Sequence, residues 1–500
     1  MKKEITGDDV EKSLMDTATQ SCRRMITASG FLGSFLQAFA TAVEEGGDSG
    51  GSAPRGVYLV GGCVRDLFLS CLLPDRPVKD SDIDIVVTGY TETTALVAAV
   101  ESVRHVVPLR GVQHVIGDFP VVKVFPAGWR GCLDIALART GEMSTGPGHR
   151  DFRFTTRDVS IEDDLRRRDF TINAIALRII VAAGALEYEI VDVTGGIDDL
   201  LKRRIAAIGD AERRYREDPI RQVRAVRFAA ELSDAGFRLA EGTYEAIKSV
   251  YPETYRDISR EPFVCEVDKA LTANFPFAYK QLSRSGILST SLPFLDGWGP
   301  KDRECVAAMI ESLAGDEHAP SVWVPVLLWA VRDDAEGTFR DGEVRLPRNF
   351  HVPSFTDHVR IMKLPRLIAH QVRLLAIMRY HGAFLWPMAA FEDAYKRVPK
   401  RQRSSFMAML KTFMTCDGFN PAEIDGLVRR LQDAPVPPSR DDGTRFFSEH
   451  DIAAGSLRAE MMFHARDCQL REGGTKGDFF RNALSWHDKR ETERSAEKKR

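Results

Sequence analysis

The chain has 500 residues, of which 44% are hydrophobic and 28% charged, with a formal net charge of −3. A chain of this length exceeds one compact core, so we expect two to four domains, and its ordinary composition indicates a globular protein. The slightly acidic balance argues against a protein that coats RNA nonspecifically. Any nucleic-acid surface must therefore be a local basic patch.

The sequence predicts neither a targeting segment nor a membrane span. Acidic residues, not an apolar core, follow the first four residues, and no apolar run approaches ~20 residues. The eight cysteines form no CxxC pair and no zinc-finger spacing with histidine. We therefore expect a reduced, cytoplasmic protein with no membrane partner. Its oligomeric state stays open.

The N-terminal part combines a helical lead-in with an α/β segment. Residues 8–43 have a helical pattern, and the Gly- and Ser-rich residues 44–56 indicate a flexible connection, so residues 1–50 are predicted as a lead-in and linker. Short apolar runs predict strands at residues 57–60, 83–88, 121–125 and 133–138. Residues 57–190 are therefore predicted to form an α/β head.

From about residue 198 the apolar pattern becomes helical. Helices are predicted at residues 220–232, 244–251, 262–273, 322–331 and 367–380. A Pro-rich break at 432–443 separates the end of the chain. The predicted fold is thus an α/β head followed by an all-α neck (191–295), body (296–431) and tail module (444–500).

A glycine pair joins the first predicted strand of the head to a helical pattern. Gly61 and Gly62 allow close approach of a phosphate to the backbone, and Arg65 follows one turn later. This arrangement is typical of a triphosphate-binding turn. The pair alone also fits an ordinary strand-to-helix turn.

Acidic residues open the second predicted strand. Asp80, Asp82 and Asp84 alternate, so all three can share one face, and a divalent cation would relieve their repulsion. Mg²⁺ prefers such carboxylate oxygens. Asp134, between apolar residues of a later strand, is a candidate third carboxylate on the strand next to the aspartate pair. The alternatives are a solvated acidic turn for the aspartate cluster and an edge-strand acid facing water for Asp134.

Two arginine-rich segments follow. Three arginines at 166–168 precede an apolar stretch that is predicted to be helical. Further on, Asp218 is predicted as a helix N-cap with proline at the first helical position. Arg221, Arg224 and Arg227 then recur every three residues and form one ridge, which a triphosphate would neutralise. The alternative is that these arginines pair only with Glu217 and Asp218.

In this order, the motifs resemble the class II tRNA nucleotidyltransferase (CCA-adding enzyme) and bacterial poly(A) polymerase family. The matching stretches are LVGGCVRD (59–66), KDSDI (79–83), RRDFTINA (167–174) and EDPIRQVRAVRFAA (217–230). The resemblance covers roughly residues 57–295. It implies a polymerase-beta-like nucleotidyltransferase head and a neck with a nucleotide-selecting helix.

The resemblance also implies roles for individual residues. Asp80 and Asp82 would ligate Mg²⁺, with Asp84 as a bystander or support, and Asp134 is added as a catalytic candidate. The incoming nucleotide would be held by Gly61, Gly62, Arg65, Arg168, Asp218, Arg221, Arg224 and Arg227. Of these, Asp218 and Arg221 would present a base-like edge to CTP or ATP, so that the protein itself is the template.

Two activities share these motifs. Residues 117–121, 136–140 and 159–165 resemble the CCA-adding branch, whereas residues 208–219 look more like the poly(A) polymerase branch. The absence of a basic C-terminal tail favours tRNA, a compact substrate gripped by shape. We therefore expect CCA addition to tRNA from CTP and ATP by a two-Mg²⁺ mechanism. Poly(A) polymerase is the alternative, and a non-catalytic RNA-binding protein of the same fold is a more distant one.

The body departs from many CCA-adding enzymes of bacteria. Residues 322–385 look similar to an HD phosphohydrolase scaffold, yet residues 326–331 are apolar where the His-Asp metal pair would be expected. His450-Asp451 stands far downstream. We therefore predict a degenerate HD-like scaffold without phosphohydrolase activity, which serves as an RNA-binding body.

Overall fold

The computed structural model describes most of the first 330 residues and parts of the rest. The described residues are 7–28, 30–46, 53–73, 83–116, 120–127, 129, 131–144, 152–316, 321–330, 400–416, 446–447, 461–462, 465 and 476–497. The chain divides into two compact units, residues 1–293 and 294–500, and each is considered by itself.

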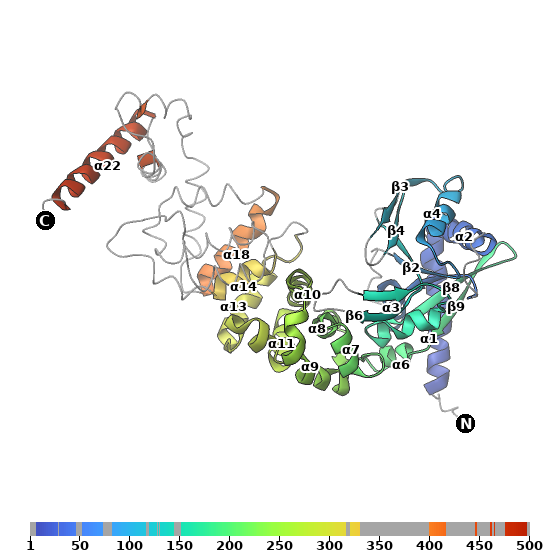
Figure 1. The fold of residues 1–500 in the computed structure, drawn as a ribbon. Helices are drawn as coiled ribbons and strands as arrows, with labels where there is room; N and C mark the ends of the chain where they lie inside the picture. The colour runs from blue at the N-terminus through green and yellow to red at the C-terminus, as the bar shows by residue number, and fades with distance from the viewer. Residues whose placement is uncertain are drawn as a thin grey trace. The chain divides into compact units, whose positions relative to one another are not determined.

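A seven-stranded mixed sheet forms the centre of the first unit (Figure 1). Its order is β3-β4-β5-β2-β1-β8-β9. Among these pairs only β2 and β5 run parallel, with Asp84 opposite Asp134 in the register. The strands are β1 (Gly56–Val60), β2 (Ile83–Thr88), β3 (Leu109–Val115), β4 (Val121–Pro126), β5 (Leu133–Leu137), β8 (Ile175–Ala182) and β9 (Ala185–Asp192).

Helices cover both faces of this sheet. α2 (Gly30–Glu45) contacts β1, β8, β9 and α4 (Thr93–Ser102), while α1 (Gly7–Ala28) contacts α3 (Gly62–Leu72). On the opposite face, α5 (Ile161–Arg166) buries Ile161 and Leu165 against Tyr58, Val60 and Val86. Alternate side chains of a strand point to the same face of the sheet, so Asp84, two residues before Val86 on β2, lies on the face that α5 covers. A small hairpin, β6 (Thr140–Ser144) with β7 (Phe152–Thr155), connects β5 to α5.

A helical segment completes the first unit. Its helices are α6 (Gly196–Leu201), α7 (Ala211–Glu217), α8 (Ile220–Glu231), α9 (Glu241–Thr254), α10 (Arg260–Ala273), α11 (Phe275–Arg284) and α12 (Ile287–Ser291). Helix α8 packs on α10 and α11, and its apolar residues Val223 and Val226 are fully buried. A short parallel pair, β10 (Arg204–Ile205) with β11 (Arg238–Leu239), ties the start of this segment to the residues after α8.

The described residues of the second unit are helical. They include α13 (Pro300–Glu311), α14 (Trp323–Ala330), α18 (Arg403–Cys416) and α22 (Lys476–Glu497). The Trp329 indole donates a hydrogen bond to Asp302 at 3.0 Å, and its ring meets Phe413 edge to face. Trp323 and Trp329 are both buried. The predicted helix at 367–380, the stretch 379–382 and His450-Asp451 lie outside the described residues.

The predicted α/β head followed by helices is confirmed, with two local corrections. The apolar stretch after the 166–168 arginines was predicted helical, but a 3-10 turn (Thr171–Asn173) leads into strand β8. Its β-branched residues pair with both β1 and β9, and this two-sided pairing is not visible in the local pattern. Strands β3, β8 and β9 were not predicted individually.

The second correction concerns Asp218. Its backbone N–H donates to the carbonyl of Arg214, so Asp218 caps the end of α7, and Pro219 (φ −62°) precedes α8. Because α7 and α8 follow each other so closely, the N-cap is one residue later than predicted. Within the described ranges, no helix is long and apolar enough to span a membrane, and the seven cysteines there are free thiols.

Candidate functional site

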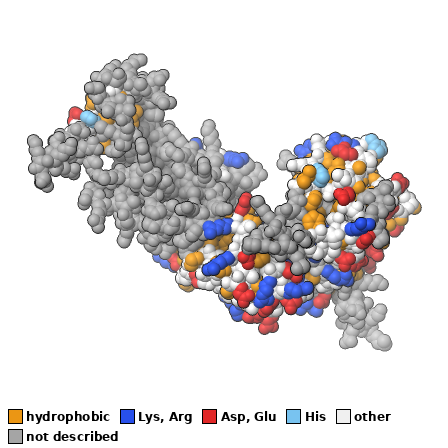
Figure 2. Space-filling view, in the orientation of Figure 1, with side chains coloured by type: hydrophobic (Ala, Val, Ile, Leu, Met, Phe, Trp, Pro, Cys, Tyr) orange, Lys and Arg blue, Asp and Glu red, His pale blue; other side chains and the backbone are white. Residues whose placement is uncertain are grey.

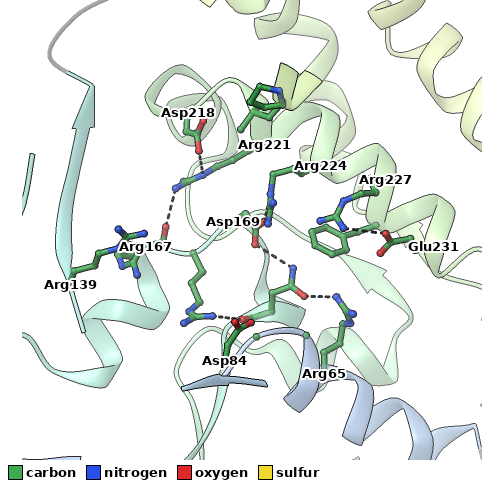
Figure 3. A pocket seen from close by; sticks show the side chains of 17 residues that line it. Arg65, Asp84, Arg139, Arg167, Asp169, Asp218, Arg221, Arg224, Arg227 and Glu231 are labelled. Atoms are coloured by element: carbon green, nitrogen blue, oxygen red, sulfur yellow. Dashed lines mark hydrogen bonds and ion pairs between the residues drawn. The ribbon is translucent and has the colours of Figure 1, made fainter. Parts of the chain in front are cut away.

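A cavity of about 700 Å³ opens between the α/β sheet and helix α8. Its walls are the Gly61–Gly62 turn, the Arg167–Asp169 segment and the arginine ridge of α8. In Figure 3, Asp169 lies between the α8 arginines on one side and Asp84 with Arg65 on the other. The cavity therefore brings together both arginine segments and the glycine turn that the sequence singled out.

The two glycines of the turn differ in backbone conformation and in role. Gly61 has φ 76° and ψ −139°, a conformation that disfavours any side chain, and a Cβ there would lie 3.2 Å from Asp84 Oδ2. Gly62 is helical, and a Cβ there would make only an ordinary contact of 3.7 Å with Arg65 Nη2. Gly61 is thus required by the backbone, whereas Gly62 keeps the cavity wall open.

Arg65 is fixed in the first turn of α3. Its guanidinium donates to Asp66 and to the side-chain oxygen of Asn173, each at 2.9 Å. Asn173 in turn donates to Asp169 at 3.3 Å. Two carboxylates and an amide therefore hold Arg65 in place at the cavity wall, and Arg65 is only 8% exposed.

A fully buried carboxylate, Asp164, organises the second group of arginines. It forms ion pairs with Arg167 at 2.6 Å and Arg168 at 3.0 Å, and accepts the backbone N–H of Arg139 at 3.2 Å. Burial alone would raise the pKa of Asp164, but the two guanidinium groups outweigh it and hold the pKa below its ordinary value. One ionised carboxylate thus orients the side chains of Arg167 and Arg168 and anchors the backbone of Arg139 at the cavity.

Asp169 links the sheet to helix α8. It accepts two hydrogen bonds from Arg224, at 2.9 Å and 2.6 Å. Burial would raise the pKa of Asp169, but the charge and hydrogen bonds of Arg224, the charge of Arg221 and the bond from Asn173 lower it to about 2. The ion pair is therefore present throughout the physiological pH range.

The remaining arginines of α8 also have carboxylate partners. Arg221 lies 3.4 Å from Asp218 and donates to the carbonyl of Arg167 at 3.2 Å. Arg227 pairs with Glu231 at 3.1 Å and with Glu266 of α10 at 2.6 Å. The alternative that the ridge pairs only with Glu217 and Asp218 is therefore wrong for Arg224 and Arg227.

The ring of Phe228 gives the arginines an apolar support. Guanidinium groups of Arg65, Arg224 and Arg227 lie over it at 5.4, 5.5 and 4.0 Å from the ring centroid. Such contacts stabilise a cation by roughly 0.5–2 kcal/mol each. The ring therefore lets three like charges converge on one wall of the cavity.

The cavity surface is basic even though its arginines are paired. Among the described residues that line it, seven are arginines and four are acids, an excess of three positive charges. Three further carboxylates that pair with these arginines, Asp66, Asp164 and Glu266, do not line it. A ligand therefore meets guanidinium groups while the neutralising acids lie behind them. On the face of the molecule shown in Figure 2, acidic and basic side chains of the described residues are interspersed.

A second, smaller cavity of about 200 Å³ adjoins the first. Asp84, Arg139, Arg167 and Arg168 line both cavities, and Asp134 lines the smaller one. Asp134 lies on an interior strand, beside β2 as predicted, and its carboxylate pairs with Lys123 at 2.6 Å. It is therefore not an edge-strand acid, and Asp84 forms part of the cavity wall.

Asp80 and Asp82 lie outside the described residues. In the part of the chain that the structure describes, no group of three histidine, cysteine or acidic residues could hold a metal ion. The carboxylates of Asp84 and Asp134 share one sheet face at the smaller cavity and offer the hard oxygen donors that Mg²⁺ prefers. The metal site stays a prediction.

Sequence reasoning missed the acids that position the arginines. Asp164 precedes Arg167 and Arg168 by three and four residues, a spacing that could have identified it. Asp169 with Arg224, and Glu266 with Arg227, are 55 and 39 residues apart, and no local pattern links them. These pairs form only when the fold brings the segment after α5 and helix α10 to helix α8.

Comparison with known families agrees with this geometry. Residues 57–206 match the family model described as the poly A polymerase head domain. The head of this chain is therefore similar to that domain. The match includes the glycine turn, Asp84, Asp134 and the Arg167–Asp169 segment of the cavity. Helix α8, which carries the other arginines, follows the head domain.

Solved structures similar to the chain extend the likeness beyond the head domain. A Bacillus stearothermophilus CCA-adding enzyme in complex with CTP is 23% identical, with a TM-score of 0.58 over 91% of this chain and 98% of that one. A Thermotoga maritima CCA-adding enzyme complexed with tRNA is 19% identical, with a TM-score of 0.53 over 90% and 94%. The chain therefore has the fold of these proteins in its helical part as well.

Proposed function

We propose that this protein adds nucleotides, without a nucleic-acid template, to the 3′ end of RNA. The observation that carries the proposal is the cavity in which seven arginines meet the glycine turn of the head domain. Guanidinium groups present rigid pairs of donors that match phosphate oxygens. The volume of about 700 Å³ lies within the range of small-molecule sites. A nucleoside triphosphate fits this charge and size.

Each wall of the cavity would bind a different part of the nucleotide. Arg65 and the backbone at Gly61 and Gly62 would hold the triphosphate, and Arg168, Arg224 and Arg227 would complete the pocket. Asp218 and Arg221 would offer acceptors and donors to the base of CTP or ATP. Arg221 is only 5% exposed and bonded to the Arg167 carbonyl, so its donors have a fixed direction. A fixed edge of this kind can select a base by hydrogen bonding.

The carboxylates beside the cavity would supply the catalytic centre. Asp80 and Asp82, which immediately precede β2, would hold Mg²⁺, with Asp134 as the third carboxylate. Bound Mg²⁺ would supply Lewis-acid stabilisation of the attacking oxygen and of the leaving pyrophosphate. The RNA 3′ oxygen would form a bond to the α-phosphorus as the bond to the pyrophosphate oxygen breaks. The hydroxyl proton would pass to solvent, and the arginines would stabilise the charge that develops on the pyrophosphate.

The substrate class that we favour is tRNA, completed with CCA from CTP and ATP. The similar structures include CCA-adding enzymes complexed with CTP, with ATP and with tRNA. They match along about nine-tenths of this chain, which supports an acceptor that also contacts the helical part. Poly(A) polymerase remains the second candidate because the head-domain family carries that description.

Incorporation of single nucleotides separates the two candidates. The full chain is incubated with Mg²⁺ and a tRNA transcript lacking CCA, with CTP alone, ATP alone, or both. We expect two additions with CTP alone and three additions, ending in A, with both nucleotides. Unlimited A addition without C would instead establish poly(A) polymerase activity. No addition to any RNA would contradict the proposal.

A further inference from the structure

We propose that the smaller cavity receives the terminal nucleotide of the RNA acceptor, whose base stacks on Phe154. This inference rests on the proposed function, because it assigns the second substrate of the same site. It concerns a ribonucleotide at a free 3′ end rather than a nucleoside triphosphate.

The cavity is too small to enclose a whole nucleoside triphosphate. Its volume of about 200 Å³ is below the range of roughly 300–1,000 Å³ typical of sites that enclose whole ligands. It can take a base or a ribose with the remainder of the RNA outside. Its floor is the sheet face at Val86 and Ala136, which is apolar and so suits the face of a base.

The position of the cavity fits an acceptor. It shares wall residues with the large cavity, among them Asp84, Arg167 and Arg168. Asp84 and Asp134 lie opposite each other in the parallel register at its edge. In Figure 3, Arg139 and Arg167 mark the margin of the large cavity on the side away from Arg227. Two nucleotides, one in each cavity, would therefore meet beside Asp84 and Asp134, close to the predicted catalytic carboxylates.

The aromatic wall of the cavity is held in place from several directions. Phe154 lies on β7, whose neighbour Thr155 pairs with Thr140 of β6. The Thr156 hydroxyl donates to the carbonyl of Thr91 at 2.9 Å. The guanidinium of Arg139 lies 5.5 Å from the centroid of the Phe154 ring. A half-buried ring with a cation beside it matches a nucleotide, since the ring can stack on a base and the arginine can pair with a phosphate.

The test compares two RNAs that differ only at the terminal base. The probes are a tRNA transcript lacking CCA and the same transcript with an abasic ribose as its last residue. Their Kd values are measured without nucleotide for the wild-type full chain and for Phe154→Leu. We expect the wild type to bind the abasic RNA about tenfold more weakly, the loss typical of one base–aromatic stack. Phe154→Leu should bind both RNAs with the weaker affinity.

Two control variants separate stacking from stability. Phe154→Tyr keeps the ring and should restore the discrimination. Phe277→Leu removes a ring from another arginine–phenylalanine contact, with Arg238 at 5.2 Å and outside both cavities, and should discriminate like the wild type. Equal binding of both RNAs by the wild type would overturn the inference even if the leucine variant failed to fold. A wild type that discriminates between the RNAs but incorporates no nucleotide would support the subsite and contradict the proposed function.

Discussion

Replacing Asp169 by asparagine removes one charge from the contact between the sheet and helix α8. The side chain keeps its size, so the packing around it is retained. Arg224 would lose its ion-pair partner at 2.6 Å and keep Glu266, at 3.8 Å, while the amide oxygen of asparagine remains a neutral acceptor. The variant therefore measures how much this ion pair stabilises the site.

The magnitude follows from the pKa of the carboxyl. A pKa of about 2, against an ordinary value of 3.8, corresponds to about 2.5 kcal/mol of stabilisation at neutral pH. Breaking a buried ion pair costs about 3–5 kcal/mol, but Arg224 is 34% exposed and recovers some hydration. We therefore expect Asp169→Asn to lower the free energy of unfolding by about 2–3 kcal/mol.

The pH dependence has a definite sign. Because the folded-state pKa of Asp169 is depressed, its contribution is complete above the ordinary value near 4 and is lost as the pH falls toward 2. The difference in unfolding free energy between wild type and variant should therefore be constant from pH 8 to 5. It should shrink below pH 4.

Native-state hydrogen exchange is the suitable assay, because the chain has two units and local stability must be resolved. Amides of β8 and α8 that exchange by opening of this region should do so about 30- to 150-fold faster in the variant. A double-mutant cycle with Arg224→Gln should give a coupling of about 2 kcal/mol. The control Asp198→Asn, at an exposed pair with Lys202, should change stability by at most about 0.5 kcal/mol. A coupling below about 0.5 kcal/mol would refute the reasoning.

Two further predictions concern the cavity wall. Gly61→Ala should destabilise the first unit by about 1–3 kcal/mol because Gly61 has a positive φ. Gly62→Ala should leave the free energy of unfolding within about 0.5 kcal/mol of wild type and raise the KM for nucleotide. Thermal unfolding and KM measurements check both variants, and equal stabilities of the two variants would contradict the assignment. Arg221→Gln should reduce the preference for CTP over ATP on a tRNA lacking CCA at least tenfold, measured as the ratio of the two kcat/KM values. An unchanged ratio would exclude a role of Arg221 in base selection.

The local patterns of the sequence identified most of the cavity wall. The spacing of Arg221, Arg224 and Arg227 predicted a ridge, and the structure has all three at one cavity. The strand carrying Asp134 was predicted next to the strand after Asp82, and β5 does pair with β2. These features depend on residues close together in the chain or on alternation within one strand, which a single sequence records.

The ion-pair partners of the arginines required tertiary information. Glu266 lies two helices beyond Arg227, and Asp169 is 55 residues before Arg224 and meets it only in the folded chain. The stretch that became β8 was misread as helical because its apolar residues carry no clear period, and pairing on both sides decides its conformation. Phe154 was likewise invisible as a site residue until the β6–β7 hairpin placed it beside Arg139.

The most direct test is incorporation of radiolabelled CTP into a tRNA transcript lacking CCA, by wild type, Asp80→Asn and Asp82→Asn, with Mg²⁺ present. We expect wild-type incorporation, and a loss of at least about 1,000-fold in each variant with unchanged tRNA affinity, because one catalytic charge is removed at the reacting phosphate. Near-normal turnover by either variant would contradict the assignment of the catalytic centre. A wild type that transfers no nucleotide would contradict the whole account.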